Sequence, residues 1–181
     1  MFKKILLVCA TTLIFCSTLK ATELSYSNVE IHSGDNDGAE TWGFGVSDEL
    51  NENLFLLISS SNTKSDTAEL DTISFGIGYH SPLNRETDFV ISTRYIEGDP
   101  QSSSENKTYG YGLKVGVRFM ESDDFEVSAG IEHSDFGGSS ADFTFGAAIN
   151  LSDSTALTLN SGISLDSERD IDFAIGFRFS N

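Results

Sequence analysis

Residues 171–179, IDFAIGFRF, alternate large apolar side chains with small or charged ones. Every odd-numbered position holds Ile or Phe, and the even-numbered positions hold Asp172, Ala174, Gly176 and Arg178. Successive side chains of an extended strand point to opposite faces, so this stretch has one apolar and one small or polar face. That pattern is typical of a barrel strand whose outside meets lipid and whose inside meets water and charge.

The same alternation recurs along the chain between clusters of turn-forming residues. It indicates about ten strands, of about the 9–11 residues that a tilted membrane strand needs. We therefore predict an all-β fold, a single up-and-down antiparallel transmembrane β-barrel of about ten strands, with eight as the alternative if two weak strands join the loops. The expected strands are 24–33, 39–48, 53–61, 70–80, 87–97, 108–120, 125–135, 141–151, 155–164 and 170–179.

The connections alternate in character, as expected for a barrel with two different ends. An even number of strands places both chain termini at the periplasmic end. Pro82 and Pro100 are both expected in connections. Short periplasmic turns are expected at 48–53, 81–86, 121–124 and 152–154, and modest outer loops at 33–38, 61–69, 98–107, 136–140 and 165–169.

The N-terminus predicts a cleaved secretory signal over residues 1–21, which leaves 22–181 as the barrel. Lys3 and Lys4 precede an apolar stretch at 5–15, and small polar residues follow it. A helix needs about 20 apolar residues to span a bilayer, so this stretch is too short for an anchor.

Charge and cysteine content exclude several classes of protein. Cys9 and Cys16 fall inside the signal, so the mature chain has no disulfide, and the bulky Phe15 before Cys16 argues against lipid modification. The formal net charge is −17, which makes nucleic acid an unsuitable partner.

Aromatic residues gather near the ends of the predicted strands on their apolar face. Amphipathic rings favour the level of the lipid headgroups, so we predict two aromatic girdles. The outer girdle comprises Trp42, Tyr95, Tyr109 and Phe143, and the inner one Tyr79, Phe89, Phe119, Phe125 and Phe179.

The opposite face of the strands carries many glycines and charges of both signs. Strand glycines on the surface of a soluble β-sandwich would weaken the sheet, whereas inside a narrow barrel they leave room for long neighbours. We therefore favour the membrane barrel over a soluble sandwich or lipocalin-like barrel. Seven inward residues are expected to form a lumen charge network, namely Glu30, Arg94, Lys114, Arg118, Glu126, Glu132 and Arg178.

The chain resembles the small outer-membrane β-barrels of Gram-negative bacteria, such as OmpX and the OmpA barrel. Within that group it is similar to the diffusible-signal-factor-regulated outer-membrane protein family. The residues that carry this likeness are 26–31 (YSNVEI), 73–80 (ISFGIGYH), 109–119 (YGYGLKVGVRF) and the final GFRF. The resemblance implies outer-membrane location and a barrel of eight to ten strands, and it carries over no catalytic residues.

One departure from that group lies at the C-terminus. Outer-membrane barrels usually finish on an aromatic residue that the insertion machinery reads, whereas Ser180 and Asn181 follow Phe179 here. We still expect insertion, with lower efficiency.

Enzyme and metal functions find little support in the sequence. The trio His133, Ser134 and Asp135 is contiguous, so neighbouring side chains point to opposite faces and cannot form a triad. The acidic outer loops lack the ligand spacing of a calcium loop. We predict no enzyme activity, no cofactor and no metal site.

The function expected from the sequence is that of an integral outer-membrane protein with a structural or surface-interaction role. Its lumen is expected to be largely filled by charged and small side chains. Its partners would be outer-membrane lipid, lipopolysaccharide and the barrel-insertion machinery. The alternative is a small, weakly selective channel, and an outer-membrane enzyme comes third.

Overall fold

The structure is a computed structural model that describes residues 24–36, 38–101, 106–165 and 171–180 of the 181-residue chain. The predicted signal at 1–21 lies outside the described residues. No helix in the described part of the chain is long and apolar enough to cross a membrane. The strands are β1 (Asn28–Asn36), β2 (Ala39–Asn51), β3 (Leu54–Lys64), β4 (Glu69–Pro82), β5 (Thr87–Pro100), β6 (Thr108–Ser122), β7 (Phe125–Asp135), β8 (Ser139–Ser152), β9 (Thr155–Ser164) and β10 (Ile171–Ser180).

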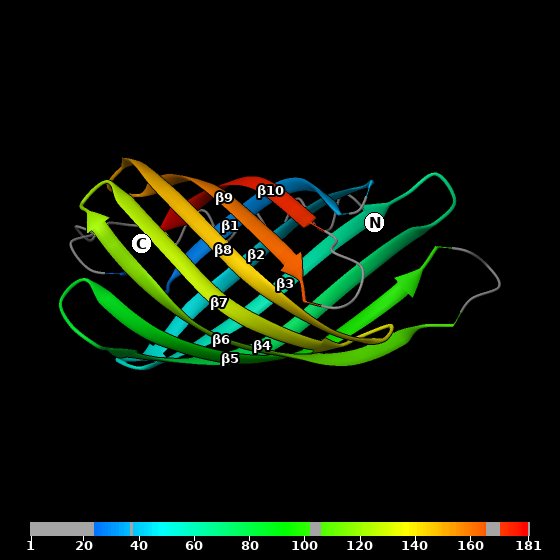
Figure 1. The fold of residues 1–181 in the computed structure, drawn as a ribbon, viewed down its shortest axis with the longest axis horizontal. Helices are drawn as coiled ribbons and strands as arrows, with labels where there is room; N and C mark the ends of the chain where they lie inside the picture. The colour runs from blue at the N-terminus through cyan, green and yellow to red at the C-terminus, as the bar shows by residue number, and fades with distance from the viewer. Residues whose placement is uncertain (1–23, 37, 102–105, 166–170, 181) are drawn as a thin grey trace.

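The ten strands form one closed antiparallel barrel in which each strand pairs with its neighbours in sequence (Figure 1). β1 and β10 close it, with Asn28 opposite Ser180 at one end and Asn36 opposite Asp172 at the other. The predicted ten-stranded barrel is therefore confirmed, and the eight-stranded alternative is excluded. Closure leaves no unpaired strand edge along the wall.

The two ends of the barrel differ. The first described residue, Leu24, precedes β1 at the same end as Ser180, the last residue of β10, and we call this the terminal end. The connections β2–β3, β4–β5, β6–β7 and β8–β9 also lie there, at the left of Figure 1. The remaining connections form the loop end, where the β3–β4 hairpin and the neighbouring ends of β5 and β6 project farthest (Figure 1).

Several strand boundaries differ from the sequence prediction. β1 begins at Asn28 rather than at residue 24, and it continues to Asn36 through what was expected to be a loop. Pro82 and Pro100 are the last residues of β4 and β5 rather than parts of the connections. A strand end tolerates proline because the missing N–H is not needed there to continue the ladder.

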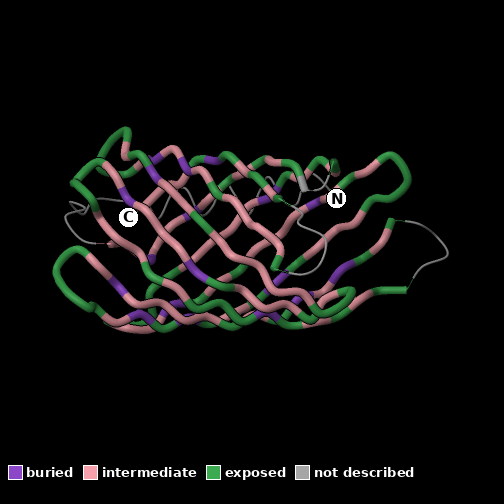
Figure 2. Tube along the Cα trace, viewed as in Figure 1, coloured by how far each residue is buried: buried purple, intermediate pink, exposed green. Residues whose placement is uncertain are grey.

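The register sorts the side chains of every strand into an outward and an inward set. Outward positions are apolar and exposed, as at Phe75, Leu113, Ile131 and Phe177. Figure 2 shows only short buried segments along a wall that is otherwise intermediate or exposed. No large side chain in the described residues is completely buried. The barrel therefore holds together by strand pairing and lumen contacts rather than by a hydrophobic core.

Inward glycines make room for long side chains from neighbouring strands. A Cβ at Gly78 would clash with the ring of Phe55, which points into the lumen from β3. A Cβ at Gly112 would lie 3.0 Å from Nε of Arg94. These two glycines therefore allow an aromatic ring and a guanidinium to lie flat against the inner wall.

Gly78→Val should destabilise the barrel because the added atoms displace Phe55. Overpacking of this kind costs roughly 1–3 kcal/mol. The measurement is thermal unfolding in detergent, with Gly45→Val as the control because its nearest neighbours would lie 3.9 Å from the new Cβ. Equal unfolding temperatures for the two variants would contradict this packing argument.

Candidate functional site: the lumen

The segment before β1 enters the lumen at the terminal end instead of continuing the strand. Tyr26 is only 3 % exposed, and its ring stacks on His80 of β4 with ring centroids 3.9 Å apart. The Phe55 ring lies 4.8 Å away, and the guanidinium carbon of Arg118 lies 4.4 Å from the Tyr26 ring centroid. A cation over an aromatic face is an attractive contact. Tyr26 therefore contacts side chains from β3, β4 and β6 at once.

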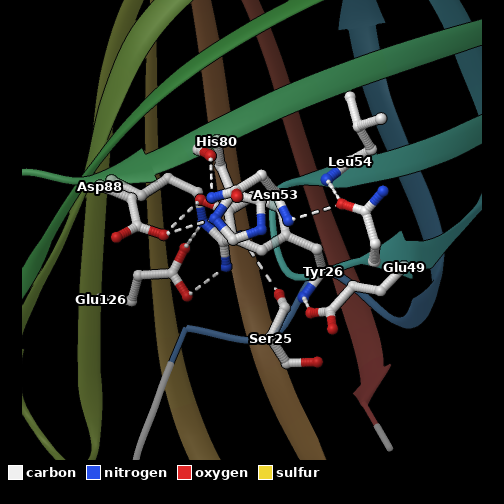
Figure 3. Close-up of polar contacts among 10 residues, drawn as sticks. Ser25, Tyr26, Glu49, Asn53, Leu54, His80, Asp88 and Glu126 are labelled. Atoms are coloured by element: carbon white, nitrogen blue, oxygen red, sulfur yellow. Dashed lines mark hydrogen bonds and ion pairs between the residues drawn. The ribbon is translucent and has the colours of Figure 1, made fainter.

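Hydrogen bonds fix the same segment to the wall (Figure 3). The Tyr26 hydroxyl donates to Oδ2 of Asp88 at 3.0 Å, and Nδ1 of His80 lies 3.1 Å from the same oxygen. The backbone N–H of Tyr26 donates to Glu49 at 3.0 Å, and its carbonyl accepts a hydrogen bond from Ser47. We use the name terminal-end floor for residues 25–26 together with Ser47, Glu49, His80 and Asp88.

The carboxylate of Glu126 joins two arginines from different strands beside this floor. Arg118 donates to both Glu126 oxygens at 2.9 and 3.0 Å, and Arg178 donates to both at 3.3 and 2.7 Å. Arg118 also donates to the carbonyl of Ser25 at 3.1 Å. Paired guanidinium–carboxylate bonds are the strong, directional kind. The cluster thus connects β6, β7, β10 and the segment before β1.

A second ion pair lies farther along the lumen. Arg94 of β5 bonds to Glu132 of β7 across β6. Lys114 of β6 stands directly opposite Glu132 in the register and is exposed, yet it has no ion pair or hydrogen bond with any described residue. Glu132 is therefore paired with Arg94, and the side chain of Lys114 faces the lumen cavities.

Glu30 lies apart from the cationic members of the predicted network. Its Oε1 accepts hydrogen bonds from Thr158 at 3.0 Å and from Asn160 at 3.1 Å. No cation forms an ion pair with it among the described residues. The structure thus brings Arg118, Glu126 and Arg178 together and joins Arg94 to Glu132, whereas Glu30 and Lys114 form no ion pair with a described residue.

The lumen contains two cavities of about 390 Å³ each. The inner cavity rests on Tyr26, Arg118 and Arg178, and the other lies nearer the loop end beside His32. Arg94, Lys114 and Glu132 line both cavities, so this group stands at the junction between them.

The predicted girdle residues lie in two groups near opposite ends of the wall. Tyr95 and Tyr109 stack with centroids 6.3 Å apart, and Phe143 packs on Phe145 at 4.5 Å. Trp42, Tyr79, Tyr95 and Tyr109 are exposed, whereas Phe89, Phe119, Phe125, Phe143 and Phe179 are partly covered by neighbours.

An ion pair outside the lumen lies beyond the girdle at the loop end. Lys107, in the β5–β6 connection, donates a hydrogen bond to Glu97 and lies 3.6 Å from Asp99. The Glu97 carboxylate raises the pKa of the Lys107 ammonium through this hydrogen bond.

The histidines do not assemble into a catalytic site. Ser134 pairs with Gly112, which lines the lumen, so the adjacent His133 lies on the other face. His80 and Asp88 contact Tyr26 instead of a nucleophile in an open cleft. No group of three or more His, Cys, Asp or Glu side chains is arranged to hold a metal ion within the described ranges.

Sequence reasoning missed the terminal-end floor. The sequence pattern predicts a strand over 24–33 that includes Tyr26, and it assigns no inward role to Phe55, His80 or Asp88. The sequence does contain a sign of the inward position of Tyr26. In an extended chain Tyr26 lies on the same face as Asn28 and Glu30, which is the inward face.

Comparison with solved structures identifies the fold. The NanC porin in a rhombohedral crystal form aligns with a TM-score of 0.60 and 10% identity, covering 84% of this chain and 100% of that one. The KdgM porin aligns with a TM-score of 0.55 and 10% identity, and the alignment covers 85% of this chain and 99% of that one. A structure of the KdgM porin in complex with disordered oligogalacturonate aligns with a TM-score of 0.52 and 8% identity, and it covers the same shares of the two chains.

The chain thus has the fold of the KdgM and NanC porins. No protein-family model matches the chain, and no curated protein matches it. Identities of 8–10% show the fold and leave the function open.

Arg118→Leu should lower the thermal unfolding temperature in detergent. The variant leaves Glu126 with one arginine and removes the cation over Tyr26. Removing one partner of a buried ion pair costs about 3–5 kcal/mol. The matched control is Arg85→Leu, which alters an exposed arginine in the β4–β5 turn. If both variants unfold at the same temperature, the Glu126 cluster does not stabilise the barrel.

Proposed function

We propose that this protein resides in the outer membrane as a barrel closed at its periplasmic end, with a structural or surface-interacting role. The terminal end would face the periplasm, because a barrel with an even number of strands has both termini there. The apolar outer wall would contact lipid, and the girdle residues would lie at the headgroups. The similarity to the diffusible-signal-factor-regulated family fits this proposal.

The observation that carries the proposal is the terminal-end floor. The Tyr26 ring occupies the lumen at the terminal end, where it stacks on His80 of β4 and lies under Arg118 of β6, and hydrogen bonds join Tyr26 to β2 and β5. The Glu126 cluster lies beside it and narrows the remaining space. Solutes entering from the loop end would reach this floor and stop.

The polar loop end would face the medium. Glu97, Asp99 and Lys107 there form a charged surface above the outer girdle. Such a surface suits contact with lipopolysaccharide and water, and the barrel-insertion machinery would be a transient partner during assembly.

A small, weakly selective channel is the second candidate. Two cavities that share Arg94, Lys114 and Glu132 favour it, since they leave open space along the lumen. The KdgM and NanC porins have this fold at low identity. The two candidate functions differ in whether solutes can pass the terminal-end floor.

Membrane residence predicts heat-modifiable mobility. Unboiled protein from the outer-membrane fraction should migrate faster on a gel than boiled protein, because a closed barrel resists detergent. Recovery in the soluble periplasmic fraction without a shift would contradict the membrane assignment.

Tyr26→Ala should open a path through the barrel. In planar bilayers the wild type should show no steady conductance, whereas the variant should show small, regular steps because the ring no longer closes the floor. Tyr111→Ala is the matched control, since Tyr111 lies on the outward face of β6. Steady conductance of the wild type equal to that of Tyr26→Ala would favour the channel.

A further inference from the structure

Two charged side chains that form no ion pair with a described residue face the inner cavity from opposite walls. The ring order places β1 and β6 five strands apart in either direction, so they stand across the lumen from one another. Glu30 lies on β1 and Lys114 on β6, and both line the inner cavity. No ion pair joins them.

Two neighbours hold the carboxylate of Glu30 in place, and this carboxylate can accept further hydrogen bonds. Thr158 and Asn160 both donate to its Oε1 and hold the side chain against β9. Its Oε2 receives no hydrogen bond from the described residues. An ionised carboxylate accepts about four hydrogen bonds, so an incoming cationic group could bind here without displacing either neighbour.

The opposite wall offers unused donors. Lys114 carries three N–H donors, and none of them bonds to the described residues. Arg94 beside it uses one terminal nitrogen for Glu132, and its side chain is 41% exposed to the lumen. An ammonium and a guanidinium side by side suit a carboxylate.

We propose that the inner cavity binds a small zwitterion of the peptide or amino-acid type, with its carboxylate at Lys114 and Arg94 and its ammonium at Glu30. A ligand with both charges satisfies both walls, whereas a simple anion or cation satisfies one. The ligand enters from the loop end past Arg94 and Glu132, which line both cavities. The inference rests on the proposed closure, because the floor makes this cavity a dead end.

The test is calorimetric titration of glycylglycine into the full chain in detergent. Its two charges lie at opposite ends of an extended molecule. Acetate and ethylammonium, titrated separately at the same ionic strength, carry one charge each. Glycylglycine should bind saturably with one molecule per barrel, and each half-ligand should bind about tenfold more weakly or not at all.

Variants assign the binding to the two walls. Lys114→Met and Glu30→Gln should each weaken glycylglycine binding about tenfold or more, the loss expected for a charge-assisted contact. Lys114→Arg should retain binding because it keeps the cation. Lys107→Met and Glu97→Gln remove the same residue types from the pair outside the lumen and should bind as the wild type does.

Three results would overturn the inference. They are no binding of glycylglycine to the wild type, equal binding by acetate, and unchanged affinity in both lumen variants. Heat-modifiable mobility of each variant shows that its barrel is folded. A closed, non-conducting wild type that binds no glycylglycine would overturn this inference alone, whereas a conducting wild type would overturn the proposed function.

Discussion

The pairing of β1 with β10 is the constraint on which the rest of the structure depends. It gives every strand two hydrogen-bonded neighbours and leaves no exposed ladder. It also separates the lumen from the outer surface, so each strand presents one face to the lumen and the other to the surroundings of the barrel. The ring order then decides which residues face one another, and it sets Glu30 across from Lys114.

Inside this ring, the barrel replaces a hydrophobic core with paired charges and hydrogen bonds. Glu126 accepts hydrogen bonds from Arg118 and Arg178, and the Tyr26 hydroxyl donates a hydrogen bond to Asp88. A buried charge without a partner is costly, so such groups persist where their hydrogen bonds are made. Pairing is dense at the terminal end and sparse near Lys114, where cavities open. The lumen therefore has a densely bonded terminal end and an accessible middle.

The sequence predicts the direction of individual side chains but not which of them meet. The alternation in residues 171–179 and 109–119 correctly predicted outward Phe177 and Leu113, because strand parity is local. The same parity predicted that Arg118, Glu126 and Arg178 point inward. It could not tell which cations share a carboxylate, since Arg118 and Arg178 meet at Glu126 only after the wall curves round.

The sequence by itself determined the strand pattern, the apolar exterior and the small, charged interior, because each follows from the two-residue period of an extended chain. The tertiary structure decided the pairing of charges and the position of Tyr26. Its ring lies against Phe55, His80 and Arg118, and its hydroxyl bonds to Asp88. Those partners come from the four consecutive strands β3 to β6, and the curvature of the closed wall turns their side chains toward one place in the lumen, where the segment before β1 reaches them.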